Sequence, residues 1–272
     1  GCSSALSSIG SSLFKNSGGL AQATKDFTPE EEYYLGRSVS AMLLAKYPLH
    51  NKEQSLRYVN LVGKTLSSST EEPDTFGGYR FAILDANEIA AFSTPGGYVY
   101  ITSGFAKLLN SEDELAAVFA HELGHVIKRH GVEAIKQSGL TESLTSIGRD
   151  VAVSQAGFVT QQVDSLFGES VEGVFNSVVV KGYGRSQEYD ADIFAEELLS
   201  KTGYNPNELK NVLSILEKGT GAESAGGWFS THPEPKDRLE NLADNDKTAN
   251  MAKTDYNSAA RTKRFTDFKK TL

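Results

Sequence analysis

The sequence has a single cysteine among its 272 residues and no apolar run long enough to cross a membrane. An internal disulfide is therefore excluded. A membrane-spanning helix needs about 18 or more consecutive apolar residues, and no part of the chain supplies them. Basic residues are also few, 27 against 35 acidic ones, and the net charge is -8. Without a basic, aromatic-interleaved stretch, nucleic acid is not expected as the main partner.

The one cysteine, Cys2, lies in residues 1–26, a Ser- and Gly-rich stretch with the composition of a flexible tether. Gly1-Cys2 resembles the end of a bacterial lipoprotein signal, where cleavage leaves an N-terminal cysteine that carries lipid. The alternative is a cloning scar before an ordinary truncated terminus. The lipoprotein interpretation is favoured, because a spacer of this kind lets an anchored domain clear a bilayer.

The rest of the chain is expected to form one principal domain followed by a tail. With 39% hydrophobic residues the chain can bury one sizeable core, which we place at residues 27–245. Thr28, Pro29 and Glu31 form a helix-start pattern, so the folded part begins there. Residues 246–272 carry seven Lys or Arg and three Asp. They predict a polar, basic, solvated tail that is partly helical, with contact to an acidic membrane surface as the alternative.

Hydrophobic periodicity predicts an α+β fold that is mostly helical, with one small sheet. The strand-like segments are short, and the last two are joined by a Pro-Gly-Gly turn. Ser111 and Glu114 predict a capping box for the helix that follows the sheet. The predicted helices are 29–47, 52–69, one from 112 onwards, 185–203 and one from about 206, the strands are 79–84, 89–93 and 98–102, and residues 132–182 are read as broken helices with mobile connections.

The stretch "AAVFAHELGHVIKRH", residues 116–130, carries the strongest chemical signal. His121 and His125 are four residues apart, so on a helix their rings share one face and can bind one ion. Glu122 points about 100° round the helix, where its carboxylate can reach a metal-bound water. The alternative is an exposed polar patch, but the apolar residues 116–120 make unpaired burial of these groups costly.

A tetrahedral catalytic zinc takes three protein ligands and keeps one open position, so a third ligand is needed. The best candidate is Glu188, on a helix that also places Asp192 four residues further along the same face. Asp192 can then accept the spare N–H of a ligating histidine. Alternatively, the two carboxylates belong to a solvated acidic face, because other acidic residues surround them.

The three remaining histidines are weaker candidates. His130 lies five residues past His125 and near the expected helix end, where a cation suits the helix dipole, so we assign it a structural role. His50 is expected at the surface. His232, in "WFSTHPEP", is held in an extended segment by two flanking prolines. It can donate a hydrogen bond to the oxyanion that forms when water attacks a carbonyl, or it is only a turn histidine.

Four motifs in order resemble one known family. They are "FSTPGGYVYITSGF", "AAVFAHELGHVIKRH", "RSQEYDADIFA" and "STHPEPKDRL", and they extend over residues 89–239, more than half of the chain. The sequence is identified as resembling the soluble bacterial branch of the metallopeptidase family that includes HtpX and the CAAX prenyl proteases, family forty-eight. The resemblance implies a zincin-like fold of the gluzincin type, with the sheet, antiparallel or mixed, beside the HExxH helix.

The resemblance also implies roles for single residues. The zinc ligands would be His121, His125 and Glu188, the catalytic base Glu122, the supporting acid Asp192 and the transition-state histidine His232. Arg185 matches a family arginine that precedes the third ligand and supports the site from outside the ligand shell. Relatives that are periplasmic lipoproteins imply the periplasmic side of the bacterial envelope and lipid at Cys2. Ala90 stands where the family often has Asn, which puts a substrate contact from that side chain in doubt.

These features together predict a zinc-dependent endopeptidase that cleaves unfolded or misassembled envelope proteins. Zn²⁺ is the expected cofactor, polypeptides are the expected partners, and membrane contact is expected only through the lipid anchor. An extended substrate is expected to add along the strand of Tyr98, Val99 and Tyr100 as an extra strand. The main alternative is a chaperone-like or assembly factor with a latent metalloprotease site. A metal-dependent hydrolase of non-peptide substrates is a further alternative, which the order of the motifs disfavours.

Overall fold

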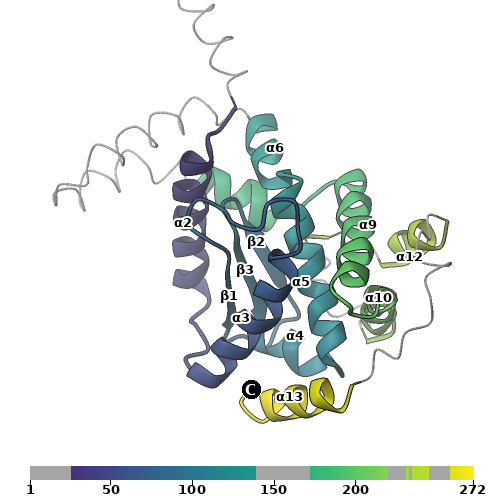
Figure 1. Ribbon diagram of the computed structural model, residues 1–272. Helices are drawn as coiled ribbons and strands as arrows, with labels where there is room; N and C mark the ends of the chain where they lie inside the picture. Colours follow the sequence, from purple (N-terminus) through teal and green to yellow (C-terminus); the bar gives the residue numbers. More distant parts are fainter. Residues whose placement is uncertain (1–25, 139–171, 220–230, 233–234, 245–257) are drawn as a thin grey trace, which may run out of the picture.

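The computed structural model describes residues 26–138, 172–219, 231–232, 235–244 and 258–272 (Figure 1). Residues 1–25 of the expected tether lie outside these ranges. So do residues 139–171, most of the segment that was read as broken helices. The elements within them are α2 (Pro29–Lys46), α3 (Glu53–Ser67), β1 (Arg80–Leu84), β2 (Ala91–Thr94), β3 (Tyr98–Thr102), α4 (Ser103–Leu108), α5 (Glu112–Ile127), α6 (His130–Gln137), η1 (Asn176–Val180), α9 (Arg185–Lys201), α10 (Glu208–Gly219), α12 (Pro235–Asp244) and α13 (Ala259–Lys269).

The three strands form one mixed sheet in the order β1-β3-β2. β3 pairs in parallel with β1, from Arg80 opposite Tyr98 onward, and antiparallel with β2, with Phe92 opposite Tyr100. The α+β class with a small sheet beside a helical majority is thus confirmed. The central position of β3 corrects one expectation, because both of its edges are already paired. An incoming peptide cannot add along Tyr98–Tyr100.

Both faces of the sheet are covered by helices, which explains why its strands are almost continuously apolar. Alternate residues point to opposite faces. Phe81, Ile83 and Val99 belong to a core shared with α3 and α5, while Phe92 and Tyr100 belong to a second core under α2. The sheet therefore fixes α5 on one side and α2 on the other.

The helix α5 lies between the sheet and α9, and it contacts both (Figure 1). Gly124 makes the close approach of α9 possible: a Cβ atom built on it would lie 3.0 Å from the Ala191 Cα. The space that Gly124 leaves free is occupied by α9. This approach brings the first turns of α9 against the second half of α5.

Caps fix the ends of several helices. Thr28 and Glu31 form the predicted capping box, with the Glu31 N–H donating to Thr28 Oγ1 at 3.2 Å and the Thr28 N–H donating to Glu31 Oε2 at 2.8 Å. Ser111 caps α5, but Glu114 does not complete a box, because its carboxylate accepts the Asn110 N–H at 2.6 Å instead.

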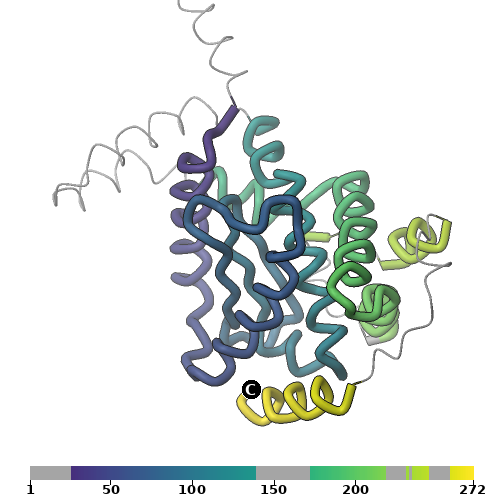
Figure 2. The backbone as a smooth tube through the Cα atoms, viewed as in Figure 1, coloured from purple at the N-terminus to yellow at the C-terminus, as the bar shows by residue number. Residues whose placement is uncertain are grey.

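The C-terminal helix α13 is part of the core, so the prediction of a solvated tail is wrong for residues 258–272. Phe265 and Phe268 are buried with residues of α3 and α5, and Figure 2 shows the yellow helix crossing below the ends of those two helices. Arg264 Nη2 donates to the buried Glu112 Oε1 at 2.6 Å. Seven of the eleven residues of this helix are charged or carry a hydroxyl group, and in the sequence they obscured its apolar positions.

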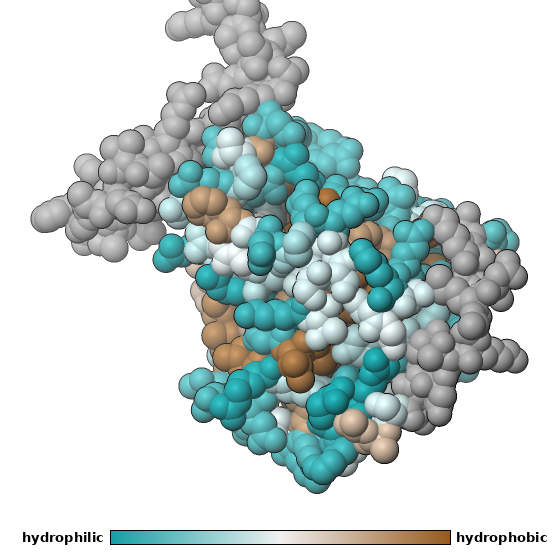
Figure 3. Space-filling model, viewed as in Figure 1, coloured by the Kyte–Doolittle hydropathy of each residue, from teal (hydrophilic) through white to brown (hydrophobic). Residues whose placement is uncertain are grey.

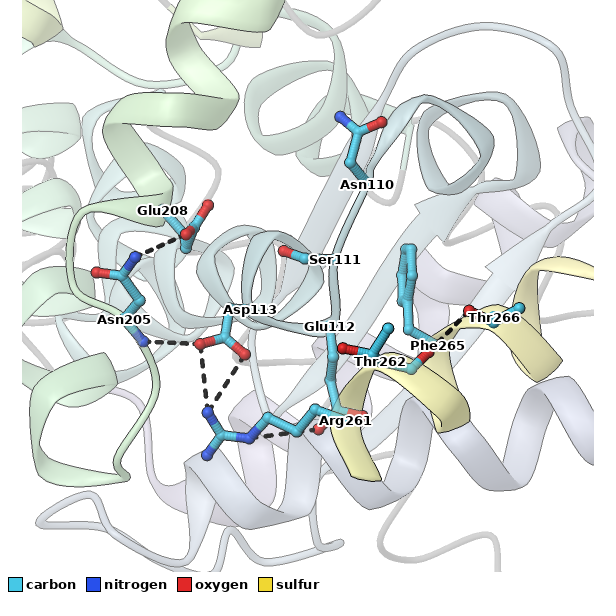
Figure 4. Close-up of a pocket in the computed structure, with 10 residues that line it drawn as sticks. All are labelled: Asn110, Ser111, Glu112, Asp113, Asn205, Glu208, Arg261, Thr262, Phe265 and Thr266. Atoms are coloured by element: carbon cyan, nitrogen blue, oxygen red, sulfur yellow. Dashed lines mark hydrogen bonds and ion pairs between the residues drawn. The ribbon is translucent and has the colours of Figure 1, made fainter. Parts of the chain in front are cut away.

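Beside α13, a pocket of about 370 Å³ opens between the first turn of α5 and the start of α10 (Figure 4). Several of its polar groups contact one another. Arg261 Nη1 donates to both Asp113 oxygens at 3.3 Å, and the Asn205 N–H donates to Asp113 Oδ2 at 2.9 Å. These contacts join α13 and the α9–α10 connection to the start of α5.

The surface seen in Figure 3 is mostly hydrophilic or intermediate, with hydrophobic residues in small separate groups. The large apolar side chains that are exposed come from different elements and loops: Leu49, Leu56, Leu61, Phe76 and Val180. No helix in the described ranges combines the length and the apolar character that a membrane crossing requires.

Candidate metal centre

The meeting of α5 and α9 brings two imidazoles and one carboxylate together in the interior. His121 Nε2 lies 3.1 Å from His125 Nε2 and 3.5 Å from Glu188 Oε2, and His125 Nε2 lies 3.3 Å from Glu188 Oε1. Zinc bonds of about 2.0–2.1 Å in tetrahedral geometry separate ligand atoms by about 3.3–3.4 Å. The spacing of these imidazole and carboxylate atoms therefore fits a zinc ion.

Glu122 lies beside this cluster and has no hydrogen-bond partner among the described residues. Both carboxylate oxygens are buried and accept no hydrogen bond from the described residues. An unsatisfied buried carboxylate is costly, so its persistence points to a ligand or a water at this place. The structure thus brings His121 and His125 together and places the Glu122 carboxylate next to them.

His232 joins the same cluster from outside α5 and α9. Its Nδ1 lies 2.8 Å from Glu188 Oε1 and 3.4 Å from His121 Nε2, while its Nε2 lies 3.6 Å from Glu122 Oε1. One ligand atom from each of His121, His125, Glu188 and His232 lies within 4.8 Å of the others. His232 can therefore serve as a hydrogen-bond donor at the site or as a fourth metal ligand.

A buried ion pair supports the cluster from behind. Asp192 Oδ1 lies 2.8 Å from His121 Nδ1, so it can orient this ring as expected from the sequence. Arg238, which is fully buried, donates from Nε to Asp192 Oδ2 at 2.8 Å and places Nη1 3.2 Å from Glu188 Oε2. Arg238 lies in the fourth sequence motif, "STHPEPKDRL", but no role was predicted for it.

These charges set the protonation of the site. Burial alone favours neutral acids, but His232 and Arg238 hold the pKa of Glu188 well below its usual range. Burial likewise opposes ionisation of Asp192, and Arg238 lowers its pKa. Burial and Arg238 both disfavour a charged His121, yet its hydrogen bonds to Asp192 and Glu188 raise its pKa to about 9. The carboxylates are thus ionised, which a metal ligand requires.

Comparison with known sequences decides the family. The profile of Peptidase family M48 matches residues 53–246, which include all of the clustered residues. The chain belongs to peptidase family M48. The three ligand candidates of this M48 chain, its Glu122 and its His232 all lie in the matched region.

Several relatives have names that refer to proteolysis. A Vibrio cholerae protein named as a beta-barrel assembly-enhancing protease is 30% identical over 227 residues, which cover 80% of this chain and 44% of the relative. The beta-barrel assembly-enhancing protease of Escherichia coli K12 is 25% identical over 210 residues, 77% of this chain and 42% of the relative. Metalloprotease YcaL of the same strain is 27% identical over 164 residues, 60% of this chain and 61% of the relative. The chain spans less than half the length of the first two.

Two further residues contact the ligand candidate His125. His130 Nδ1 lies 2.9 Å from His125 Nδ1, and the ring of Tyr183 stacks on His125 with 4.0 Å between centroids. His130 begins α6 rather than ending α5, so the helix-dipole argument made for it from the sequence is wrong. Tyr183 was not singled out, and its place before the Arg185 motif was its only sequence signal.

Arg185 lies apart from the cluster. Its side chain is 73% exposed, and Nη2 pairs with Asp237 Oδ2 of α12 at 3.3 Å. The expectation that it supports the metal ligands is therefore wrong: being the first residue of α9, it projects to solvent three residues before Glu188. The buried arginine that contacts Glu188 and Asp192 is Arg238.

The space between β2 and the cluster is narrow. A cavity of about 10 Å³ is lined by Ser93, Pro95, His125, Gly131 and Tyr183, among other residues. This volume is about that of one water molecule and is too small for a peptide. A substrate that approaches along β2 must therefore displace side chains, of which Tyr183 is the one stacked on a ligand.

Proposed function

We propose that this M48 chain is a zinc-dependent endopeptidase that hydrolyses peptide bonds of unfolded or misassembled bacterial envelope proteins. One observation carries the proposal: His121, His125 and Glu188 present ligand atoms 3.1–3.5 Å apart, and beside them lies the buried Glu122 carboxylate, which accepts no hydrogen bond from the described residues. Relatives named as beta-barrel assembly-enhancing proteases support the substrate class. A periplasmic location with lipid on Cys2 belongs to the same proposal and is supported by the sequence of residues 1–26.

The residues divide the chemistry among them. Bound zinc supplies Lewis acidity that polarises a carbonyl group and acidifies water. Glu122 takes a proton from the attacking water and returns it to the leaving amine. His232 donates its N–H to the oxyanion that forms on the carbonyl oxygen. Asp192 holds the ring of His121. Arg238 pairs with the carboxylates of both Glu188 and Asp192 and keeps them charged.

The extended substrate is proposed to lie along β2 instead of β3. Among the described residues β2 pairs with β3 alone, and it packs against α5, the helix that carries His121 and Glu122. Backbone hydrogen bonds to such an outer strand tolerate many side-chain sequences, which suits a protease for unfolded chains. Because its residues are buried in this structure, access requires movement at Tyr183.

The proposed function is tested with Glu122→Gln, which keeps the shape of the side chain and removes its basicity. We expect zinc bound at one ion per chain and cleavage of unfolded casein slowed by at least about 100-fold. Glu188→Ala is the companion variant, and we expect it to lose zinc. Elemental analysis and a fragment assay measure the two effects. A Glu122→Gln variant as active as the parent would remove this residue from the mechanism, and full zinc in Glu188→Ala would remove the third ligand.

A chaperone-like or assembly factor with a latent protease site is the second candidate. The observation that favours it is His232, which stands close enough to supply a fourth ligand atom. Four protein ligands complete a tetrahedral zinc and leave no open position for water or substrate. Such a protein would protect unfolded clients from aggregation without producing fragments, which the same casein assay detects.

A further inference from the structure

The ring of His125 has a defined donor and acceptor side. Its Nε2 faces His121 and Glu188, while its Nδ1 faces His130 Nδ1 at 2.9 Å. A metal binds an imidazole nitrogen through its lone pair, so a neutral His125 that binds through Nε2 carries its proton on Nδ1. In this state the His125 Nδ1–H donates, and His130 Nδ1 accepts.

We propose that His130 is a positioning residue for the metal ligand His125: it accepts the Nδ1 proton and so fixes the tautomer and rotation of the ligand ring. This inference rests on the zinc site of the proposed function. His130 does for His125 what Asp192 does for His121, whose Nδ1 lies 2.8 Å from Asp192 Oδ1. Both ligand histidines then have an outer partner, one a carboxylate and the other an imidazole.

A break in the helix brings His130 to this position. In one continuous helix a residue five positions after His125 would point roughly 140° away from it. Instead α5 ends at Ile127, and Arg129 adopts the left-handed conformation with φ 57° and ψ 30° before α6 starts at His130. Arg129 is the only non-glycine residue with positive φ in the described ranges. The turn it makes swings His130 back onto His125, where it is 4% exposed.

This unfavourable backbone conformation is held by the segment that precedes α2. Arg129 Nη1 donates to Asp26 Oδ2 at 2.8 Å, and its Nη2 donates to the Phe27 carbonyl at 2.9 Å and to Glu32. Asp26 also accepts from Lys136 Nζ of α6 at 2.6 Å. Asp26 thus ties the turn and the helix after it to one place, and His130 lies between these two ties.

The other face of His125 is covered by Tyr183, whose ring plane lies at 15° to the imidazole. Stacking resists tilting of the ring, but a ring turned by 180° about its Cβ–Cγ bond stacks equally well, so the stacking does not choose which nitrogen faces the cluster. The hydrogen bond to His130 makes this choice, because it needs Nδ1 of His125 on the side of His130. The two neighbours therefore constrain different motions of the same ligand.

The test compares two substitutions of nearly equal size, His130→Asn and His130→Leu. The Oδ1 atom of Asn can accept from His125 near the place of the lost Nδ1, whereas Leu offers no acceptor. We expect His130→Leu to weaken Zn²⁺ binding by about 10–100-fold in competition with a chromophoric chelator, and His130→Asn to stay near the parent value. Co²⁺-loaded samples should show a shifted visible spectrum for the Leu variant only. His50→Ala is the control for loss of a histidine away from the site.

The outcomes separate this inference from the proposed function. A parent chain that fails to bind one Zn²⁺ defeats the proposed metal site itself. A parent that binds Zn²⁺ while His130→Leu binds equally tightly overturns the role of His130 alone. Equal weakening in the Asn and Leu variants also overturns it, because the effect is then one of shape. If His130→Leu does not fold, as judged by circular dichroism, His130→Ala replaces it in the same comparison.

Discussion

His232 is the residue whose position bears most directly on activity. Its ring offers Nδ1 to the ligand cluster and Nε2 towards Glu122, at 2.8 Å from Glu188 Oε1 and 3.6 Å from Glu122 Oε1. In a protease the His232 N–H would stabilise the oxyanion. In a latent factor the His232 lone pair would occupy the fourth coordination position of the metal. The same side chain therefore distinguishes the two proposed functions.

Replacing His232 with Ala should lower kcat for casein cleavage by about 100- to 1,000-fold if the N–H stabilises the oxyanion. Zinc affinity and KM should change little, since in that role the ring binds neither the ion nor the ground-state substrate. Steady-state kinetics with a chelator competition measures all three quantities. Faster cleavage together with weaker zinc binding would contradict the oxyanion role and support the latent site.

At this scale the sequence predicted the cluster better than its surroundings. The spacing of His121 and His125 is local, and one helix brings them together. The contact of His130 with His125 was not predicted, because His130 was placed near the end of the same helix and the left-handed turn at Arg129 contains no glycine that would indicate it. Arg238 follows Lys236 and Asp237 and has the local pattern of an exposed helix. Its burial depends on α9 and α12 packing together, which no local pattern records.

At the scale of elements, the position of α13 changes the account of the C-terminus. Phe268 stacks on Tyr58 of α3 with 4.5 Å between ring centroids. Glu112, at the start of α5, accepts from Arg264 of α13 and also from Tyr58 at 2.9 Å. α13 thus joins α3 to the helix that carries both histidines. The sequence predicted partial helix here, but two phenylalanines three residues apart among basic residues gave no indication of their partners.

Phe268→Ala should therefore destabilise the whole domain by about 3–5 kcal/mol, because a side chain 2% exposed leaves a cavity between α13 and α3. Lys263→Ala on the same helix is the matched control and should change the free energy of unfolding by less than about 0.5 kcal/mol. Urea denaturation of the metal-free variants measures both values. Equal free energies of unfolding for the two variants would support the original prediction that this segment is a solvated tail.

At the scale of the whole molecule, the sheet was easier to predict than its strand order. Short segments of strand-type residues and the Pro-Gly-Gly turn are local signals, and they identified all three strands. The order β1-β3-β2 requires β1 to pair in parallel with a strand beyond its neighbour in sequence. Such long-range pairing decides which strands lie at the edges of the sheet, so the sequence did not reveal that β3, the expected substrate strand, is the central one.

The stability of the metal-free protein should fall both above and below pH 6.5, the ordinary pKa of histidine. The pKa of His121 is raised to about 9, so its contribution is complete below 6.5 and is lost as the pH rises towards 9. Burial lowers the pKa values of His125 and His130 to about 3 and about 4. Their unfolded forms take up protons first, so stability also falls as the pH drops below 6.5.

Zinc binding should then release close to one proton per ion at pH 7.5. His121 is protonated there in the metal-free protein and must give up its proton to become a ligand, whereas His125 is already neutral. Calorimetric titrations with Zn²⁺ in buffers of different ionisation enthalpy measure the number of protons. Asp192→Asn should reduce it, because the lost carboxylate no longer raises the pKa of His121. Tight zinc binding without proton release at pH 7.5 in the parent would show that the Asp192–His121 pair does not hold this proton.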